Sequence, residues 1–259
     1  MRAYSLAAGA AALVLMASSA LACQGPKVLF EDTFDRLDPT WGVEDDAFFI
    51  KNGELNILPN PDQAYYAFNN SGYYDDVDYC VDVIAINADL AGDSYAGEIF
   101  WGIDKDNYYS FLVTADGFAS VFRRQKGKTL SQVDWEKFDA VKTGADAVNQ
   151  LRVVTQGNKA TLYVNGAEFR TITGQPPDDG WQFGVRAASP KNSKATYGFD
   201  NVKITVGGAA DSDGGNTTGG GGDSDDTGGG DDSGAGDGGD SGGGAGDSGG
   251  STVGGSSGG

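Results

Sequence analysis

The side chains of this 259-residue chain that could perform acid–base chemistry are carboxylates, because the sequence has no histidine and only two cysteines. Without histidine, neither a Ser-His-Asp nor a Cys-His arrangement can form, and imidazole-bound zinc or iron is excluded. Two cysteines alone cannot complete a zinc site, and no glycine-rich motif for phosphates or dinucleotides is present. The remaining catalytic option is a pair of carboxylates about 5–9 Å apart across a groove, as glycoside hydrolysis requires.

Glu98 is the main candidate among these carboxylates. It lies in the run Tyr95–Ile103, which is rich in apolar and aromatic residues and predicts a strand. Successive strand residues alternate between the two faces of a sheet, so Glu98 and Phe100 share one face and Trp101 takes the other. If Trp101 faces the core, Glu98 faces a groove or the solvent. The sequence leaves three roles open for Glu98: an exposed strand carboxylate, a ligand contact, or a catalytic acid.

Tyr108 and Arg123 are two further candidate ligand contacts. Tyr108 and Tyr109 are adjacent in a predicted strand, so one ring points into the core and the other points outward. An outward tyrosine can stack on a sugar ring or complete the rim of the core. Arg123 ends the next predicted strand, where it can donate paired hydrogen bonds to sugar hydroxyls or a carboxylate, or protect the strand edge from unwanted pairing.

The elements that position these side chains are predicted to be β-strands. Short runs rich in Val, Ile, Phe and Tyr recur between residues 28 and 206, and turn residues separate them. Asn52-Gly53, Asn165-Gly166 and Asp116-Gly117 each predict a two-residue type I′ hairpin, which makes consecutive strands antiparallel neighbours. Ser131–Val141 is the best candidate for a short helix. The body is therefore predicted to be one all-β domain of two packed antiparallel sheets.

The last predicted strand, residues 196–206, changes its alternation partway along. Its apolar residues share one parity up to Phe199 and the other parity from Val202 onward. A β-bulge around Phe199–Asn201 would absorb this slip and re-aim the side chain of Asp200.

The first 22 residues have the pattern of an export signal. A basic residue precedes a short apolar stretch, Leu6–Met16, and Ala20-Leu21-Ala22 offers a cleavage site. Removal of residues 1–22 would leave Cys23 at the start of a mature protein in the periplasm or outside the cell. Cys23 then forms a disulfide with Cys80, carries a lipid anchor, or remains a free thiol. No other segment has the length and apolar character of a membrane span.

Residues 207–259 form a tail of different composition. They contain 25 of the 42 glycines and 10 of the 37 acidic residues, and they include no aromatic residue. Such a segment cannot bury enough apolar surface to offset the entropy of ordering it, so we predict a disordered tail after a folded domain at 23–206. The whole chain has a formal net charge of −19, which argues against nucleic acid as a partner and favours cations or neutral ligands.

Three parts of the body carry a family resemblance. They are Leu29–Asp35 with Ile50–Leu55, then Gly97–Phe111, and finally Leu162–Gly166 with Phe183–Val185 and Tyr197–Val202. Their order and spacing resemble the concanavalin A-like lectin and glucanase jelly roll, and within it the chain is most similar to exported bacterial domains grouped with 3-keto-disaccharide hydrolases and laminin-G-like modules. The resemblance spans residues 28–206. It implies a two-sheet jelly roll with sugar bound on the concave face of one sheet.

The resemblance also implies a structural calcium ion between the first strand and the last. Glu31, Asp32 and Asp35 offer hard oxygen ligands near the start, and the re-aimed Asp200 offers one near the end. Calcium takes about six to eight oxygens, so backbone carbonyls and water would complete the shell. The alternative role of these acids is to cap turns.

The glucanases of this fold place their catalytic carboxylates on one strand as Glu-x-Asp-x-x-Glu, and this chain departs from that motif. Counted from Glu98, Phe100 stands at the Asp position and Ile103 stands at the second Glu position. The sequence therefore favours a non-catalytic, lectin-like protein that binds a glycan through Glu98, Tyr108 and Arg123. Two other functions stay open: a glycoside or 3-keto-disaccharide hydrolase that uses Glu98, and a structural or adhesive surface protein.

Overall fold

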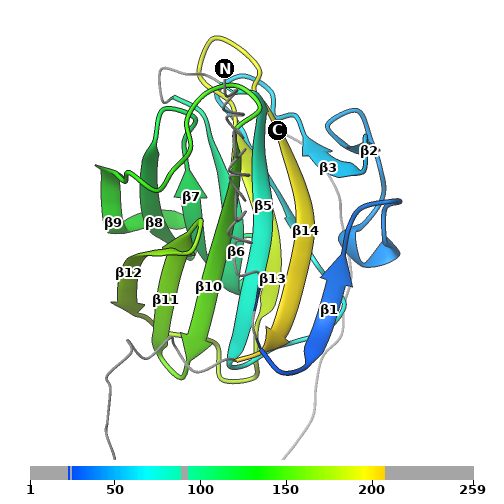
Figure 1. Cartoon of the computed structure of the whole chain (residues 1–259). Coiled ribbons are helices and arrows are strands. Elements are labelled where there is room, and N and C mark those ends of the chain that lie inside the picture. Colours follow the sequence, from blue (N-terminus) through cyan, green and yellow to red (C-terminus); the bar gives the residue numbers. More distant parts are fainter. Residues whose placement is uncertain (1–22, 24, 89–92, 208–259) are drawn as a thin grey trace, which may run out of the picture. The chain divides into compact units, whose positions relative to one another are not determined.

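The computed structural model of the chain describes residues 23, 25–88 and 93–207 (Figure 1). The predicted export signal and the predicted tail beyond residue 207 lie outside the described residues. No helix within the described part of the chain has the length and apolar character needed to cross a membrane. The strands are β1 (Val28–Asp32), β2 (Phe48–Lys51), β3 (Glu54–Ile57), β4 (Ala64–Phe68), β5 (Val77–Asn87), β6 (Tyr95–Asp104), β7 (Asn107–Val113), β8 (Phe118–Gln125), β9 (Lys128–Lys137), β10 (Val148–Gln156), β11 (Lys159–Val164), β12 (Ala167–Thr173), β13 (Gln182–Ala188) and β14 (Thr196–Val206), with a 3-10 turn η1 (Pro39–Trp41) before β2.

The strands form two antiparallel sheets. The eight-stranded sheet has the order β12-β11-β10-β5-β14-β3-β2, with β1 paired to β14 beside this path. The six-stranded sheet has the order β4-β13-β6-β7-β8-β9. Figure 1 shows β10, β5 and β14 of the first sheet in front of β6 and β13 of the second. This arrangement confirms the predicted all-β sandwich.

The core lies between the two sheets and follows the period-2 pattern of the strands. In β13, Phe183 and Val185 are fully buried against the other sheet, while Gln182 and Arg186 lie on the opposite face and are partly exposed. Burying a large apolar side chain in this way stabilises the fold by about 1.5–3 kcal/mol. The alternation therefore fixes which residues of the six-stranded sheet remain on its outer face, the face turned away from the eight-stranded sheet.

Two of the three predicted hairpin turns have the expected geometry. In the first turn, Asn52 and Gly53 have φ values of 58° and 77°. In the second turn, Asn165 and Gly166 have φ values of 51° and 84°. Positive φ at both residues is the type I′ pattern. The hairpin at Asp116-Gly117 also forms, because β7 pairs with β8, but only Gly117 has a positive φ, at 101°. That turn is therefore not type I′.

The predicted short helix at Ser131–Val141 is wrong, because most of this segment belongs to strand β9. The strand pairs with β8, and the register shifts twice, around Val121. These irregularities place Val133 against the core while Trp135 packs on the outer face against Phe122. Because residues two apart do not keep to one face here, the sequence lacks the alternation that identifies a strand.

The predicted irregularity of the last strand is present. The pairing of β14 with β5 shifts register between Asp200 and Lys203, and Asn201 has a φ of 51°. As a result, Phe199 and Val202 are both fully buried although their parities differ. The bulge thus allows one strand to serve the core along its whole length.

The predicted disulfide between Cys23 and Cys80 is also present. It ties residue 23 to the middle of β5, in the eight-stranded sheet. Beside it, Arg152 donates hydrogen bonds of 2.8 and 3.0 Å to the two carboxylate oxygens of Asp78, and both side chains are buried. This cluster stabilises the central strands β5 and β10 on the side away from the six-stranded sheet.

Candidate functional site

Glu98 does not face a groove or the solvent, so that sequence-based expectation is wrong. Its exposed fraction is 0 %, and its neighbours two residues away, Ala96 and Phe100, belong to the core between the sheets. Trp101 is buried in the same core, because it adopts a φ of 47° and the β6–β7 register shifts between Phe100 and Asp104. The alternation therefore breaks at Trp101. The inference from Trp101 to Glu98 failed for this reason.

The buried Glu98 carboxyl lacks the partners that a carboxylate needs. Neither of its oxygens has a hydrogen-bond partner in the described part of the chain. Burial raises its pKa well above the ordinary value, and the negative charge of Asp78 adds to the increase. The nearby Tyr79 hydroxyl donates instead to the carbonyl of Gly184, at 2.8 Å. Glu98 thus lies inside the sandwich in surroundings that favour its neutral form, and a glycan on the protein surface does not reach it.

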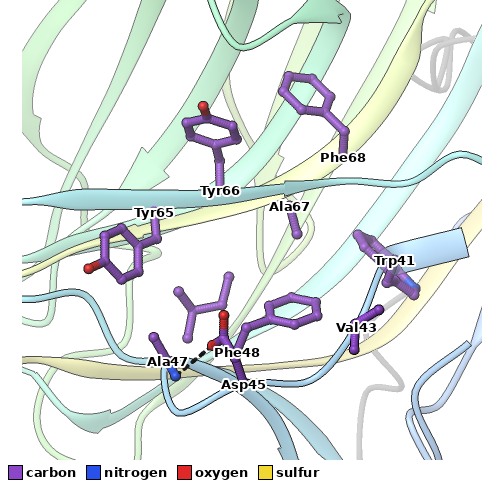
Figure 2. A pocket seen from close by; sticks show the side chains of 10 residues that line it. Trp41, Val43, Asp45, Ala47, Phe48, Tyr65, Tyr66, Ala67 and Phe68 are labelled. Atoms are coloured by element: carbon purple, nitrogen blue, oxygen red, sulfur yellow. Dashed lines mark hydrogen bonds between the residues drawn. The ribbon is translucent and has the colours of Figure 1, made fainter. Parts of the chain in front are cut away.

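The outer face of the six-stranded sheet carries a different set of side chains. On β4, Ala67 packs in the core, whereas Tyr66 and Phe68 project from the other side of the strand (Figure 2). The same alternation on β7 places Tyr109 in the core and Tyr108 on the outer face. This confirms that the adjacent tyrosines point to opposite faces.

Six aromatic rings lie on this outer face in two groups of three, and one arginine lies between the groups. Tyr66 contacts Phe68 and Tyr108, with ring centroids 5.8 and 6.3 Å apart, and Phe68 contacts Tyr108 at 5.9 Å. On the other side, Trp135 lies 5.6 Å from Tyr95 and 5.8 Å from the ring of Phe122. An arginine joins the two groups. We call this set the aromatic face: Tyr66, Phe68, Tyr95, Tyr108, Phe122, Trp135 and Arg186.

Arg186 is the polar centre of the aromatic face. Its guanidinium lies 5.5 Å from the ring centroid of Tyr95 and 5.7 Å from that of Tyr108, so one cation contacts both rings. Its Nη1 and Nη2 atoms are 3.5 Å from the hydroxyls of Ser110 and Tyr95, at the outer limit of hydrogen bonding. Its Nε is buried and has no partner among the described residues. The buried Nε is not accessible to a ligand, but the two Nη atoms are only weakly engaged within the protein.

A glycine makes room for the aromatic rings. A Cβ on Gly102 of β6 would lie 2.5 Å from the Phe68 ring and 2.8 Å from a backbone oxygen, closer than real Cβ contacts. Phe68 therefore lies directly over the backbone of β6, where it meets the Tyr108 ring from β7. Because β13 and β6 separate β4 from β7 in the sheet, this absence of a side chain is what lets rings from non-adjacent strands touch.

The two other predicted ligand contacts lie near this face but differ in position. Tyr108 belongs to the aromatic face; burial raises its pKa, while the positive charges of Arg186 and Arg124 oppose the increase. Arg123 does not belong to it. Its guanidinium lies over the ring of Tyr109, at 5.2 Å, in a separate cleft where β7 begins and β8 ends. The structure thus brings Tyr108 and Arg123 to one end of the sheet and leaves Glu98 apart from both.

A further cleft of about 370 Å³ opens beside the aromatic face, between β4 and the segment from η1 to β3. Figure 2 shows Trp41, Val43 and Phe48 across from β4, and Tyr66 at its rim. Asp45 is the only carboxylate that lines it, and its Oδ1 accepts a 2.7 Å hydrogen bond from the Ala47 amide. This cleft extends the apolar surface of the aromatic face toward the edge of the sandwich.

The predicted calcium ligands are not gathered into a coordination shell. Glu31 accepts a hydrogen bond from Lys203 at 3.2 Å, and the two oxygens of Asp32 accept from the Phe34 amide and the Trp41 indole, both at 2.9 Å. Asp32 and Asp35 lie close enough to Asp200 to raise its pKa, although burial is the larger cause. No three carboxylates among the described residues have oxygens within 4.8 Å of one another. Glu31, Asp32 and Asp35 nevertheless line one pocket, so the predicted ligands are neighbours without forming a shell, and calcium stays a prediction.

Comparisons with known proteins identify the fold. No protein-family model matches the sequence, and no curated protein matches it significantly. Among solved structures, the chain is similar to a native glycosidic hydrolase, with 10 % identity, a TM-score of 0.52, and coverage of 70 % of this chain and 97 % of that chain. It is also similar to the metal-free carbohydrate recognition domain of Emp46p, with 10 % identity, a TM-score of 0.51, and coverage of 69 % and 95 %. A protein of unknown function with a galectin-like fold from Bacillus subtilis has 8 % identity, a TM-score of 0.51, and coverage of 71 % and 98 %.

At this level of identity the likeness concerns the fold, and the described chain is a concanavalin A-like sandwich. Structures of this kind include both a recognition domain and a hydrolase, so the fold by itself does not separate binding from catalysis. The choice between binding and catalysis therefore depends on which side chains the aromatic face carries.

Sequence reasoning did not select Arg186, Tyr95 or Trp135 as ligand contacts. A signal existed for Arg186, because it is the only charged residue in the alternating run Trp181–Ala188 and its parity points away from the core. No comparable signal existed for Trp135, whose position depends on the register shifts between β8 and β9.

Proposed function

We propose that this protein binds a glycan on the outer face of its six-stranded sheet. The observation that carries the proposal is the aromatic face itself: two groups of contacting rings that Arg186 joins, with its Nη1 and Nη2 atoms held only by contacts of 3.5 Å. Aromatic rings stack on the apolar faces of sugar rings, and a guanidinium donates hydrogen bonds to the hydroxyls between them. An apolar surface with one convergent polar group is the usual composition of a small-molecule site.

Non-catalytic binding fits this face better than hydrolysis. Its seven side chains include no carboxylate, whereas glycoside hydrolysis needs two about 5–9 Å apart. Glu98, the carboxylate favoured by the sequence, lies on the other side of the sheet in the core.

A binding screen with matched variants tests the proposal. We expect the full-length protein to bind a glycan on an array, and calorimetry to show about tenfold weaker binding of the same glycan for Tyr66→Ala, equivalent to about 1.4 kcal/mol. Tyr66 suits the test because its exposed fraction is 41 %, so its truncation costs little stability. Tyr73→Ala is the control, since Tyr73 is 68 % exposed and lies outside the aromatic face. Equal affinities of the two variants would place the site elsewhere, and the absence of any glycan ligand would favour a structural or adhesive role.

Export completes the proposed function. A glycan-binding protein of this kind would act in the periplasm or outside the cell, which agrees with the signal pattern of residues 1–22 and with a disulfide between Cys23 and Cys80. Because Cys23 is bonded to Cys80, we propose that this cysteine is a structural residue and not a lipid attachment site.

A further inference from the structure

A second cleft, of about 150 Å³, opens where β7 begins and β8 ends, beside the aromatic face. Tyr108 lines this cleft and also belongs to the aromatic face, so a bound chain of sugars can contact both places. The charged residues that line it are Arg123, Arg124 and Lys126. We call it the basic cleft.

The charge of the basic cleft is opposite to that of the protein. Among the described residues, three cationic side chains and no carboxylate line it, in a chain with 37 acidic and 18 basic residues. The nearest acid that the structure pairs with it is Asp106, whose Oδ1 lies 3.7 Å from Arg124 Nη2. The exposed fraction is 42 % for the Asp106 side chain and 34 % for that of Arg124, so solvent weakens their attraction. The cleft therefore keeps a local positive charge.

Arg123 is held in a fixed position with most of its donors unused. Its guanidinium packs over the Tyr109 ring at 5.2 Å, and its Nη2 donates a 2.7 Å hydrogen bond to Gln175 Oε1. The backbone amide of Gln175 in turn donates to the Tyr109 hydroxyl at 3.1 Å. No other hydrogen bond of the Arg123 guanidinium occurs within the described residues. A planar guanidinium fixed in this way suits two oxygens of a carboxylate or sulfate group.

Arg124 connects the basic cleft to the aromatic face. It lies opposite Tyr108 in the β7–β8 register, and its Nε donates a 3.0 Å hydrogen bond to the carbonyl of Lys105. Arg124 and Arg186 both act electrostatically on the Tyr108 phenol. Two arginines thus flank one ring, and Lys126 adds a third positive charge that is exposed to solvent.

We infer that the basic cleft binds an anionic substituent, a carboxylate or a sulfate, of the glycan that the aromatic face stacks against, and that the ligand is therefore an acidic glycan. This inference rests on the proposed function and adds the ligand class to it. The net charge of the whole chain favours cations or neutral ligands, but a ligand responds to the local potential at its site, and the basic cleft reverses the sign there.

The test compares three soluble polymers of similar length: a uronic-acid polymer, a sulfated polysaccharide and a neutral polysaccharide. Calorimetry with the full-length protein should give at least tenfold tighter binding for one of the two acidic polymers than for the neutral one. This advantage should shrink as the salt concentration rises, because screening weakens charge–charge attraction. The acidic polymer that binds more tightly identifies the anion as carboxylate or sulfate.

Variants assign the preference to the basic cleft. Arg123→Gln/Arg124→Gln should lose at least tenfold in affinity for the acidic polymer and little for the neutral one. Lys51→Gln/Lys159→Gln removes the same charge from exposed positions on the eight-stranded sheet and should leave the preference intact. Lys126→Gln, at an exposed side chain without a hydrogen-bonding partner among the described residues, should give a smaller loss with an unchanged melting temperature, so a folding defect can be separated from lost binding.

Two results would overturn the inference. Equal affinity for acidic and neutral polymers would remove the anion subsite while leaving the proposed glycan binding in place. An equal loss of affinity in the two double variants would mean that the overall charge, and not the basic cleft, sets the preference. Failure of all three polymers and of the glycan array would instead refute the proposed function.

Discussion

Replacement of Glu98 should stabilise the protein, which is unusual for a change in the core. Both oxygens of this carboxyl are buried without a hydrogen-bond partner in the described part of the chain. Because burial raises the pKa of this carboxyl from its ordinary value of 4.5, keeping it neutral costs up to about 3 kcal/mol at pH 7, since each pH unit costs about 1.4 kcal/mol. Burying its polar atoms unpaired costs about 1–3 kcal/mol more.

Two substitutions separate these two costs. Glu98→Gln removes the titration but keeps a buried polar group, so near pH 7 it should be more stable than the wild type by up to about 3 kcal/mol and nearly equal to it at pH 4. In Glu98→Met the new side chain is unbranched like that of Glu but carries no buried polar group that needs a partner. This variant should be more stable than the wild type at both pH values, by about 1–3 kcal/mol at pH 4.

The pH dependence has a definite sign. Below the pKa that Glu98 has in the unfolded chain, both states hold the proton and its contribution to stability is fully present. Because burial raises the pKa in the folded state, only the unfolded state releases the proton as the pH rises, so stability falls until the pH passes the raised value. Urea unfolding between pH 4 and pH 8 should therefore show that the stability advantage of Glu98→Met over the wild type widens as the pH rises, with a slope of up to about 1.4 kcal/mol per pH unit.

An exposed carboxylate serves as the control, and Glu168→Gln should leave the pH profile unchanged. A Glu98→Met variant that is less stable than the wild type, with a parallel pH profile, would refute the reasoning, because it would mean that Glu98 is ionised and paired. Glycan affinity should be unaffected by either change at Glu98; loss of binding would restore the sequence-based prediction that Glu98 contacts the ligand.

Three other predictions concern the opposite sheet and its edge. Cys23→Ser/Cys80→Ser should lower the free energy of unfolding by about 2–5 kcal/mol in chemical denaturation, because the unfolded chain loses a cross-link. Arg152→Met should lower it by about 3–5 kcal/mol, since its carboxylate partner stays buried, whereas Arg170→Met breaks an exposed ion pair and should cost less than about 1 kcal/mol in the same assay. If calcium binds near β1 as the resemblance implies, a chelator should lower the melting temperature of the calcium-loaded protein; an unchanged midpoint would discard that prediction.

The sequence predicted the fold well because local pattern and tertiary arrangement agree along most strands. Alternation identified the faces of β10, β11 and β13, and the change of parity at Phe199 and Val202 correctly located a bulge. The hairpins at Asn52-Gly53 and Asn165-Gly166 depend on two residues each, so they too could be read directly. These features need no knowledge of which strands become neighbours.

The candidate site could be predicted only in part, because it depends on pairing between distant strands. Trp101 carries a φ that no residue pattern announces, and this single irregularity reversed the inferred orientation of Glu98. Arg186 acquires its importance from rings on β6 and β7, which lie far from it in the sequence. Tyr108 could be selected because it is adjacent to Tyr109 in one strand, so that one of the two rings must point outward.

The pairing of β1 with β14 determines where attachments to the domain sit. Val28 lies opposite Thr205, so the described chain enters and leaves the sandwich at one spot. That spot is on the eight-stranded sheet, whereas the rings and Arg186 occupy the outer side of the six-stranded one. A tether, fusion partner or solid support joined at either end would therefore attach at the eight-stranded sheet and leave the aromatic face free for the large polymer that we propose it binds.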